Sequence, residues 1–268
     1  MTVLLNVLRV LAAVIWTGVV GIPVVVVIYS RWGYGLVRAW CGDAAALDRM
    51  LEGNAVVTCW AAQRLWASVL LPLCGVRVRV REDATLDWEL PHVVCANHAS
   101  LFDILVLVRV VPVPFRFVAK RELLKWPVIG WVLRPGGQIV IDRARHDEAV
   151  RAIARAGQRR IRGQVIFFVE GTRTRTGALL PFRKGAFHFA LEQQLPILPT
   201  AVRGSYSVLA KLPWWRLRPG RNIEVVFCPP LPPPVLGPEQ SVAGAVEAAL
   251  VATRDSISGA LGQSQAAT

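Results

Sequence analysis

Residues 10–30 form an uncharged apolar run, and this run constrains the fold more than any other feature of the chain. A membrane-spanning helix needs about 20 such residues, and the run contains 21. Tryptophan and tyrosine lie near its ends, as in the aromatic belt of a membrane interface. Pro23 would kink the helix, which also suits a helix that enters only one leaflet. A buried core helix is the alternative interpretation.

A second apolar segment covers residues 55–73 and is interrupted by Gln63 and Arg64. This pattern predicts an amphipathic helix that lies on the membrane or on the first helix. A buried core helix again remains the alternative. We therefore predict two parts: an N-terminal helical hairpin that anchors the chain to a membrane (residues 1–74) and a second domain (residues 75–268).

The chain is basic and apolar together, with 31 Lys and Arg against 18 Asp and Glu and 54% apolar residues. Disordered segments are poor in apolar residues, so the chain is expected to fold. A net charge of +13 suits nucleic acid or an anionic membrane surface. We expect no nucleic-acid partner, because no recognition motif accompanies the charge. The five cysteines contain no CxxC pair, so no metal site is predicted.

Strands and helices alternate along the second domain. This alternation is typical of the α/β class, and we predict a mostly parallel mixed sheet flanked by helices. The predicted strands are residues 76–81, 92–97, 136–143, 164–174 (running into a turn), 196–204 and 222–228. The predicted helices follow residue 97 and cover 146–163, 184–194 and 241–260.

A histidine follows the second of these strands, in the sequence Asn97-His98-Ala-Ser-Leu-Phe-Asp103. The carboxyl ends of strands are where α/β sheets place their sites. Asp103, in the first turn of the next helix, can hold one imidazole nitrogen while the other acts as a general base. Alternatively, Ser100 and Asp103 form a capping box, and Asp103 only accepts backbone N–H groups.

The loop at residues 168–177 (FVEGTRTRTG) follows another apolar strand and combines glycine, hydroxyl groups and arginine. Such a loop can cradle a phosphate through backbone N–H groups and bidentate guanidinium contacts. Lys184 can add a further positive charge. The alternative is an ordinary turn with solvated arginines.

Two further basic groups are weaker candidates. Asp142 and Arg143 end the strand GGQIVIDR, where a plain salt bridge would account for them. Lys120 lies in FVAKRELLKWPVIGW, where snorkelling at a membrane surface would account for its position.

The ordered set NHxxxxD, GxxxIDR, EGTR and a late Ile-Leu-Pro strand (residues 197–199) resembles the glycerolipid acyltransferases over about residues 75–230. The resemblance implies that His98 is the general base and Asp103 its orienting partner. The substrate site that it implies comprises Asn97, Arg143, Glu170, Gly171, Thr172 and Arg173, with accessory roles for Lys120 and Lys184. Val169 departs from the family pattern, which usually has proline at this position.

The resemblance also implies the reaction. An acyl group would move from acyl-CoA or acyl-ACP to the free sn-2 hydroxyl of 1-acyl-sn-glycerol-3-phosphate (lysophosphatidic acid), giving phosphatidic acid, with no bound cofactor. The expected location is a bacterial inner membrane, with the catalytic domain on the cytoplasmic side and in contact with the phospholipid surface. Another lysolipid acceptor, such as lyso-ornithine lipid, is the nearest alternative. A non-catalytic, membrane-docked lipid-binding protein is the alternative from a different class.

Overall fold

The computed structural model describes residues 2–40, 55–126, 130, 133, 137–141, 163–211, 216–236 and 241–263. The helices are α1 (Thr2–Trp40), α3 (Ala55–Leu73), α4 (Phe102–Val110), the 3-10 helix η2 (Arg121–Lys125), α7 (Gly185–Gln193), α8 (Ser205–Val208) and α9 (Val242–Leu261). The strands are β1 (Val76–Glu82), β2 (Val93–Ala96), β3 (Phe115–Lys120), β4 (Ile139–Ile141), β5 (Gln164–Phe168), β6 (Ile197–Arg203) and β7 (Arg221–Phe227).

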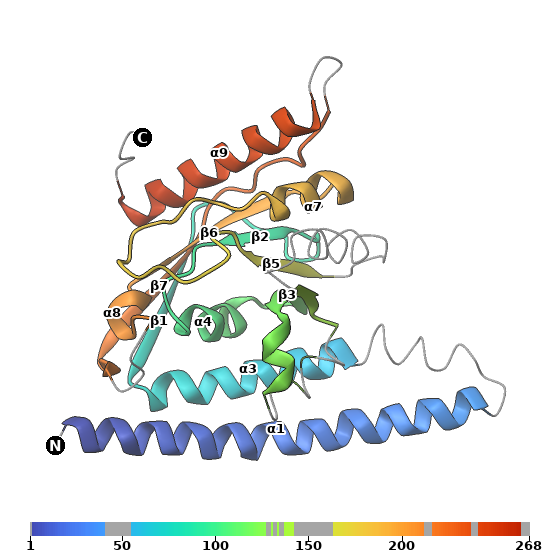
Figure 1. Cartoon of the computed structure of the whole chain (residues 1–268), viewed down its shortest axis with the longest axis vertical. Helices are drawn as coiled ribbons and strands as arrows, with labels where there is room; N and C mark the ends of the chain where they lie inside the picture. The colour runs from blue at the N-terminus through green and yellow to red at the C-terminus, as the bar shows by residue number, and fades with distance from the viewer. Residues whose placement is uncertain are drawn as a thin grey trace.

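The strands form a single mixed sheet in the order β1-β7-β6-β2-β5-β3-β4. Strands β6, β2, β5, β3 and β4 pair in parallel, whereas β6 and β7 pair antiparallel. Helices cover both faces: α7 and α9 pack on one face, and α4, backed by α3 and α1, lies on the other (Figure 1). The sheet is therefore the middle layer of the domain, as predicted for an α/β fold flanked by helices.

The period-two alternation of strand side chains divides the core in two. In β2, Val94 and Ala96 pack into a cluster with α3 and α4, while Val93 and Cys95 pack into a cluster with α7 and α9. All four side chains have no solvent exposure. A strand buried on both faces reads as a continuous apolar run, which is why this segment was recognisable in the sequence.

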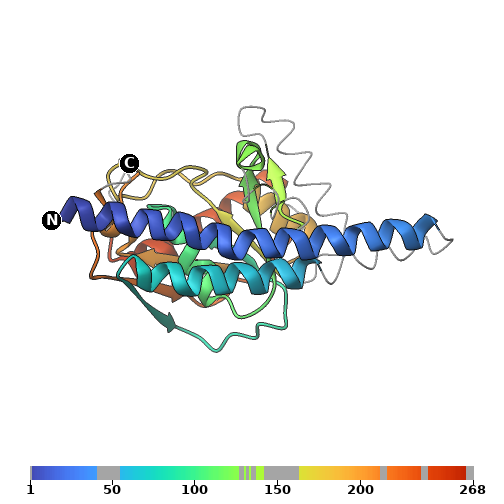
Figure 2. The same cartoon turned by 90° about the horizontal axis from the view of Figure 1, so that it is seen from below.

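The N-terminal helices α1 and α3 run side by side in opposite directions across one face of the domain (Figure 2). The indole N–H of Trp66 donates to the Thr17 hydroxyl at 3.0 Å, and the indole N–H of Trp16 donates to the Trp66 carbonyl at 3.2 Å. On its inner side, α3 buries Ala67 and Leu71 completely against the core cluster of α4. The amphipathic helix predicted for 55–73 thus packs on the first helix and on the core.

The outer face of α1 is apolar and exposed. Over Leu4–Val27 the helix is long and apolar enough to cross a membrane, and very little of this stretch is buried in the protein. Its exposed side chains recur at helical spacing, with Leu11, Ile15, Ile22 and Val26 each more than half exposed. Water is an unfavourable environment for such a face, because each buried CH₂ group gains about 0.8 kcal/mol.

The observed elements confirm the predicted fold class, although β3 and the short helices η2 and α8 were not predicted. Strand β3 was not predicted, because its short apolar alternation follows Pro112 and Pro114, which are unfavourable in a strand interior. Residues 146–162 of the predicted helix 146–163 lie outside the described residues. The predicted boundary between residues 74 and 75 stays a prediction, and α3 shares its buried side chains with the second domain.

We predict that the outer face of α1 holds the chain in lipid. The double variant Ile15→Lys/Ile22→Lys should lower the fraction of protein that sediments with membranes, because a lysine inside a bilayer costs about 2.5–3.5 kcal/mol. The matched control is Val242→Lys/Val251→Lys, which places two lysines on the exposed side of α9 and should sediment as wild type. Full sedimentation of the α1 variant with membranes would mean that another surface provides the main attachment.

Candidate active site

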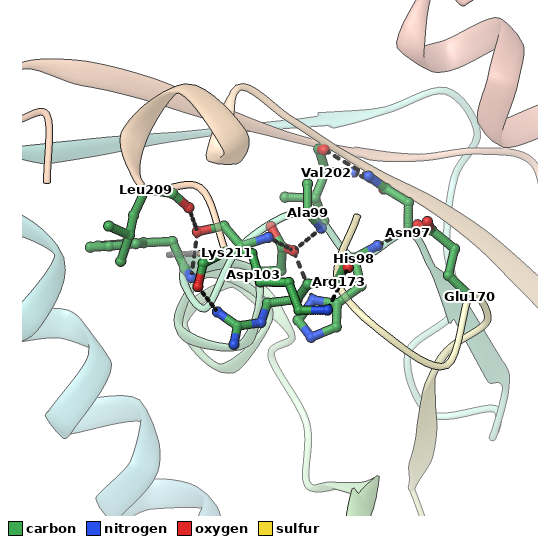
Figure 3. A network of polar contacts seen from close by, with 11 residues as sticks. Asn97, His98, Ala99, Asp103, Glu170, Arg173, Val202, Leu209 and Lys211 are labelled. Carbon is green, nitrogen blue, oxygen red and sulfur yellow. Dashed lines mark hydrogen bonds and ion pairs between the residues drawn. The ribbon is translucent and has the colours of Figure 1, made fainter. Parts of the chain in front are cut away.

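Two loops meet at the carboxyl edge of the sheet. Strands β2 and β5 are parallel neighbours in register, with Ala96 beside Phe168, so the chain leaves both strands at the same level. The loop after β2 carries His98 and the loop after β5 carries Glu170 and Arg173 (Figure 3). The backbone N–H of Thr174 donates to the His98 carbonyl at 3.0 Å, which joins the loops directly.

His98 and Asp103 form a buried pair. The imidazole Nδ1 lies 2.9 Å from the Asp103 Oδ2, and the aspartate has no solvent exposure. A carboxylate in this position favours the tautomer with hydrogen on Nδ1 and leaves Nε2 as the basic nitrogen. Among the described residues, no hydrogen-bond partner of Nε2 is found. The arrangement can therefore take a proton from a group that enters the site.

Asp103 also organises the turn that carries the histidine. Its Oδ2 accepts the backbone N–H groups of Ala99 and Ser100 at 2.6 and 2.7 Å. The Ser100 hydroxyl accepts the N–H of Phe102 and donates to the Leu209 carbonyl at 2.7 Å. The two interpretations of the sequence were thus not exclusive, because one carboxylate oxygen serves both the imidazole and the backbone.

The His98 ring is held on one face by an aromatic side chain. Phe168, the last residue of β5, stacks on it with ring centroids 4.0 Å apart and planes 17° apart. Phe117 of β3 stacks in turn on Phe168, at 5.9 Å. With Nδ1 bound to Asp103, the stack fixes the orientation of the imidazole. Phe168 lies at the start of the predicted loop, and no role was predicted for it from the sequence.

Glu170 is a buried carboxylate that ties the loops together. Its Oε1 accepts the backbone N–H of His98 at 2.7 Å, and its Oε2 accepts that of Leu180 at 2.8 Å. Burial raises the pKa of Glu170 to about 7, while these two N–H donors oppose the rise. The resemblance placed Glu170 in the substrate site. In the structure both its oxygens are used by the protein backbone, which makes it a positioning residue for His98.

The turn after β5 requires glycine at one position. Gly171 has φ +72°, a conformation that other residues adopt rarely, and a Cβ there would lie 3.2 Å from the Arg183 side chain. Val169 precedes it and donates its N–H to the Ala96 carbonyl at 3.1 Å. Proline, which the family usually has at this position, lacks this donor. The departure from the family pattern therefore adds a hydrogen bond between the site's two strands.

Arg173 and Thr172 contact Lys211, for which no role was predicted from the sequence. The Lys211 ammonium donates to the Thr172 hydroxyl at 3.2 Å and to the Arg173 carbonyl at 3.4 Å. The Arg173 guanidinium in turn reaches the Lys211 carbonyl at 3.5 Å. Burial lowers the pKa of the Arg173 guanidinium, and the charge of Asp103 opposes this. Arg173 and Asp103 are therefore electrostatically coupled across the site, as their closeness in Figure 3 indicates.

The other predicted residues have different surroundings. The Asn97 side chain binds the Val202 backbone, with its Oδ1 accepting at 2.7 Å and its Nδ2 donating at 3.1 Å. Lys120 forms an ion pair with Glu122 at the end of β3, and Lys184 forms one with Glu247 of α9. Among the described residues neither lysine forms a hydrogen bond or ion pair with His98, and their accessory roles stay predictions. Asp142 and Arg143 lie outside the described residues.

Within the described ranges, no group of three or more His, Cys, Asp or Glu side chains is arranged to hold a metal ion. What the geometry offers is a fixed general base beside arginine and lysine, at the carboxyl edge of an α/β sheet. Ser100, the hydroxyl nearest to His98 in sequence, is engaged with Leu209 and is not aligned by the imidazole. This combination suits a reaction in which the imidazole takes a proton from a hydroxyl of the substrate itself.

Comparison with known proteins finds similarity to acyl-transferring enzymes. Residues 77–203 match the family model described as Acyltransferase. The matched region includes β2, β5 and both loops of the site. This confirms the resemblance to glycerolipid acyltransferases drawn from the four sequence blocks.

Several curated relatives carry a more specific name. The chain is 39% identical over 135 residues to human 1-acyl-sn-glycerol-3-phosphate acyltransferase beta, covering 50% of this chain and 48% of the relative. It is 30% identical over 173 residues to the 1-acyl-sn-glycerol-3-phosphate acyltransferase of Saccharomyces cerevisiae, covering 63% and 57%. The chain thus spans about half to three fifths of the length of these relatives.

A solved structure extends the likeness of fold to almost the whole chain. The crystal structure of the 1-acyl-sn-glycerophosphate (LPA) acyltransferase PlsC from Thermotoga maritima superposes with a TM-score of 0.62 at 20% sequence identity. The match covers 96% of this chain and 99% of the other. The N-terminal helices are therefore part of the shared architecture.

The titration of Glu170 yields a prediction about stability. A carboxyl group whose pKa is higher in the folded than in the unfolded state stabilises the fold fully below its unfolded pKa. This contribution is lost as the pH rises through the folded pKa. The free energy of unfolding should therefore fall between about pH 4.5 and pH 7, by up to about 3 kcal/mol.

Glu170→Gln removes the titrating group and should flatten this dependence. The measurement is denaturant unfolding of the detergent-solubilised protein at several pH values, with Glu192→Gln on α7 as the control for loss of a carboxylate. Equal pH slopes in wild type and Glu170→Gln would show that Glu170 is ionised in the folded protein throughout this range.

Proposed function

We propose that this chain is a 1-acyl-sn-glycerol-3-phosphate acyltransferase. It would transfer a fatty acyl group from a thioester donor to the free sn-2 hydroxyl of lysophosphatidic acid and so form phosphatidic acid. The observation that carries the proposal is the buried His98–Asp103 pair, whose basic nitrogen faces no nucleophile of the protein among the described residues. The names of the relatives and the shared fold support the choice of substrates.

In the proposed reaction, His98 Nε2 takes the proton of the sn-2 hydroxyl as the oxygen attacks the thioester carbonyl carbon. Asp103 stabilises the imidazolium that forms. The tetrahedral oxyanion then collapses, the carbon–sulfur bond breaks, and the imidazolium returns the proton to the departing thiolate. No acyl-enzyme is required, which agrees with the engagement of the Ser100 hydroxyl by Leu209.

The acceptor is assigned from charge. A phosphomonoester brings up to two negative charges into the site, and a guanidinium can bind it through two parallel hydrogen bonds. Arg173 is partly buried and lies near His98 in Figure 3. Lys211, which supports the Arg173 turn, adds a second positive charge. A lysolipid without a phosphomonoester offers less to these two groups.

The exposed apolar face of α1 supports a location at a membrane, where both the acceptor and the product reside. We place the enzyme at a bacterial inner membrane with its site on the cytoplasmic side, because acyl thioesters are cytoplasmic metabolites. Protease digestion of spheroplasts tests the orientation, since the domain should be cleaved only after the membrane is opened.

One prediction of the proposed function concerns the general base, His98. His98→Ala should reduce acyl transfer to lysophosphatidic acid by about 10²–10⁴-fold, the contribution of a positioned general base. The measurement is turnover of purified enzyme with labelled palmitoyl-CoA and a panel of lysolipid acceptors. His188→Ala, which removes an exposed histidine of α7, is the matched control and should keep full activity. Near-normal turnover of His98→Ala would overturn the mechanism, and preference for a phosphate-free acceptor would overturn the substrate.

A further prediction of the proposed function concerns Arg173. Arg173→Lys keeps the charge but loses bidentate binding, so the acceptor KM should rise. Arg173→Ala should lower kcat/KM for the acceptor by about 10–150-fold, equivalent to about 1.5–3 kcal/mol. The donor KM should change much less in both variants. If only the donor KM changed, Arg173 would belong to the thioester's site instead.

A further inference from the structure

A basic cavity of about 600 Å³ lies beside α8, next to the active site, with which it shares Lys211. We define this basic cavity by Arg175, Tyr206, Lys211, Arg216 and Arg218. Its four cations come from three segments: the turn after β5, the end of the α8 loop, and the approach to β7. None of the described lining residues carries a carboxylate, and His98, Asp103 and Arg173 do not line the cavity.

The segment at residues 208–211 separates the cavity from the catalytic loop and contacts both. Leu209 accepts the Ser100 hydroxyl on the catalytic side, while its neighbours Val208 and Ala210 line the cavity. Lys211 contacts the Arg173 turn and also lines the cavity (Figure 3). The Tyr206 hydroxyl donates to the Arg175 carbonyl at 2.7 Å and so fixes the opposite wall. The basic cavity is thus a second compartment that shares a wall with the site.

We propose that the basic cavity binds the phosphorylated nucleotide of an acyl-coenzyme A donor. This inference rests on the proposed function, which requires a thioester donor. The nucleotide carries a diphosphate and a 3′-phosphate, and four cations without a carboxylate complement that charge. The volume falls in the range of small-molecule sites, and the Tyr206 ring offers a surface for the adenine.

The number of bonds between reacting atom and phosphate in each substrate assigns the cavity to the donor and not to the acceptor. In lysophosphatidic acid only four bonds separate the sn-2 oxygen from phosphorus, so the phosphate must remain beside the base, near Arg173. In acyl-CoA a long pantetheine arm separates the sulfur from the diphosphate. Only the donor can therefore place its thioester at His98 and its phosphates across the wall formed by residues 208–211.

Shape favours coenzyme A over an acyl carrier protein. A carrier protein presents its acidic residues on a convex surface and brings one phosphodiester on its prosthetic group. A concave cavity of this size accommodates a small-molecule ligand instead. The acyl carrier protein remains the alternative donor, and the kinetic test below distinguishes it from coenzyme A.

The test uses the full chain in detergent and the double variant Arg216→Gln/Arg218→Gln. Arg254→Gln, which removes an exposed arginine on α9, is the control for loss of positive charge. Kinetics are measured with palmitoyl-CoA, with S-palmitoyl-4′-phosphopantetheine, which lacks the nucleotide, and with palmitoyl-ACP. The KM for palmitoyl-CoA should rise by about 10-fold or more in the double variant, while the KM values for palmitoyl-phosphopantetheine and for the acceptor stay within about twofold.

Calorimetry with adenosine 3′,5′-bisphosphate tests the cavity without turnover. Wild type should bind the bisphosphate, more weakly when KCl is raised from about 50 to about 300 mM, and the double variant should lose this binding. That result would stand even if lysophosphatidic acid proved not to be the acceptor, which separates this inference from the proposed function. A rise in the acceptor KM alone would assign the cavity to the lipid head group. A rise for palmitoyl-ACP with unchanged palmitoyl-CoA would assign it to the carrier protein, and undiminished bisphosphate binding in the double variant would overturn the proposal.

Discussion

One buried carboxylate holds the two loops of the site in a fixed relation. Glu170 accepts a backbone N–H from the histidine loop and another from the segment that returns after the EGTR turn. Without it, the buried N–H of His98 would be unpaired, at a cost of about 1–3 kcal/mol, and the partly buried N–H of Leu180 would lose its partner. Parallel pairing of β2 with β5 brings the loops to one edge, and Glu170 sets their spacing. The histidine's orientation by Asp103 and Phe168 depends on this frame.

The two halves of the molecule meet through α3. This helix buries Leu71 in the core of the α/β domain and packs its other side on α1. Asn6, near the start of α1, donates to the Leu217 carbonyl in the segment before β7 at 2.9 Å. That segment also supplies Arg216 and Arg218 to the basic cavity. The membrane-facing helix and the cavity wall are therefore mechanically connected.

Much of the site could be predicted from local sequence, because strand ends and turn residues leave local signals. His98, Asp103 and Gly171 were found in this way, and their catalytic and binding roles remain predictions. Lys211 could not be found, since it reaches Thr172 from 39 residues away and no local pattern marks it. The ion pair of Lys184 with Glu247 could not be predicted from the sequence for the same reason. The backbone role of Glu170 was also unpredictable, because an N–H partner has no side-chain signature.

The stacking of His98 on Phe168 restricts the order of events in the proposed reaction. With one ring face covered and Nδ1 committed to Asp103, the imidazole presents a single nitrogen and cannot turn over to present the other. The proton removed from the acceptor must therefore leave by the atom that received it. The acceptor's hydroxyl and the donor's thioester sulfur must then both approach His98 Nε2. Both substrates must therefore be bound before the O–H or the C–S bond breaks. The proposed reaction therefore has no half-reaction in which an acyl group is stored on the protein.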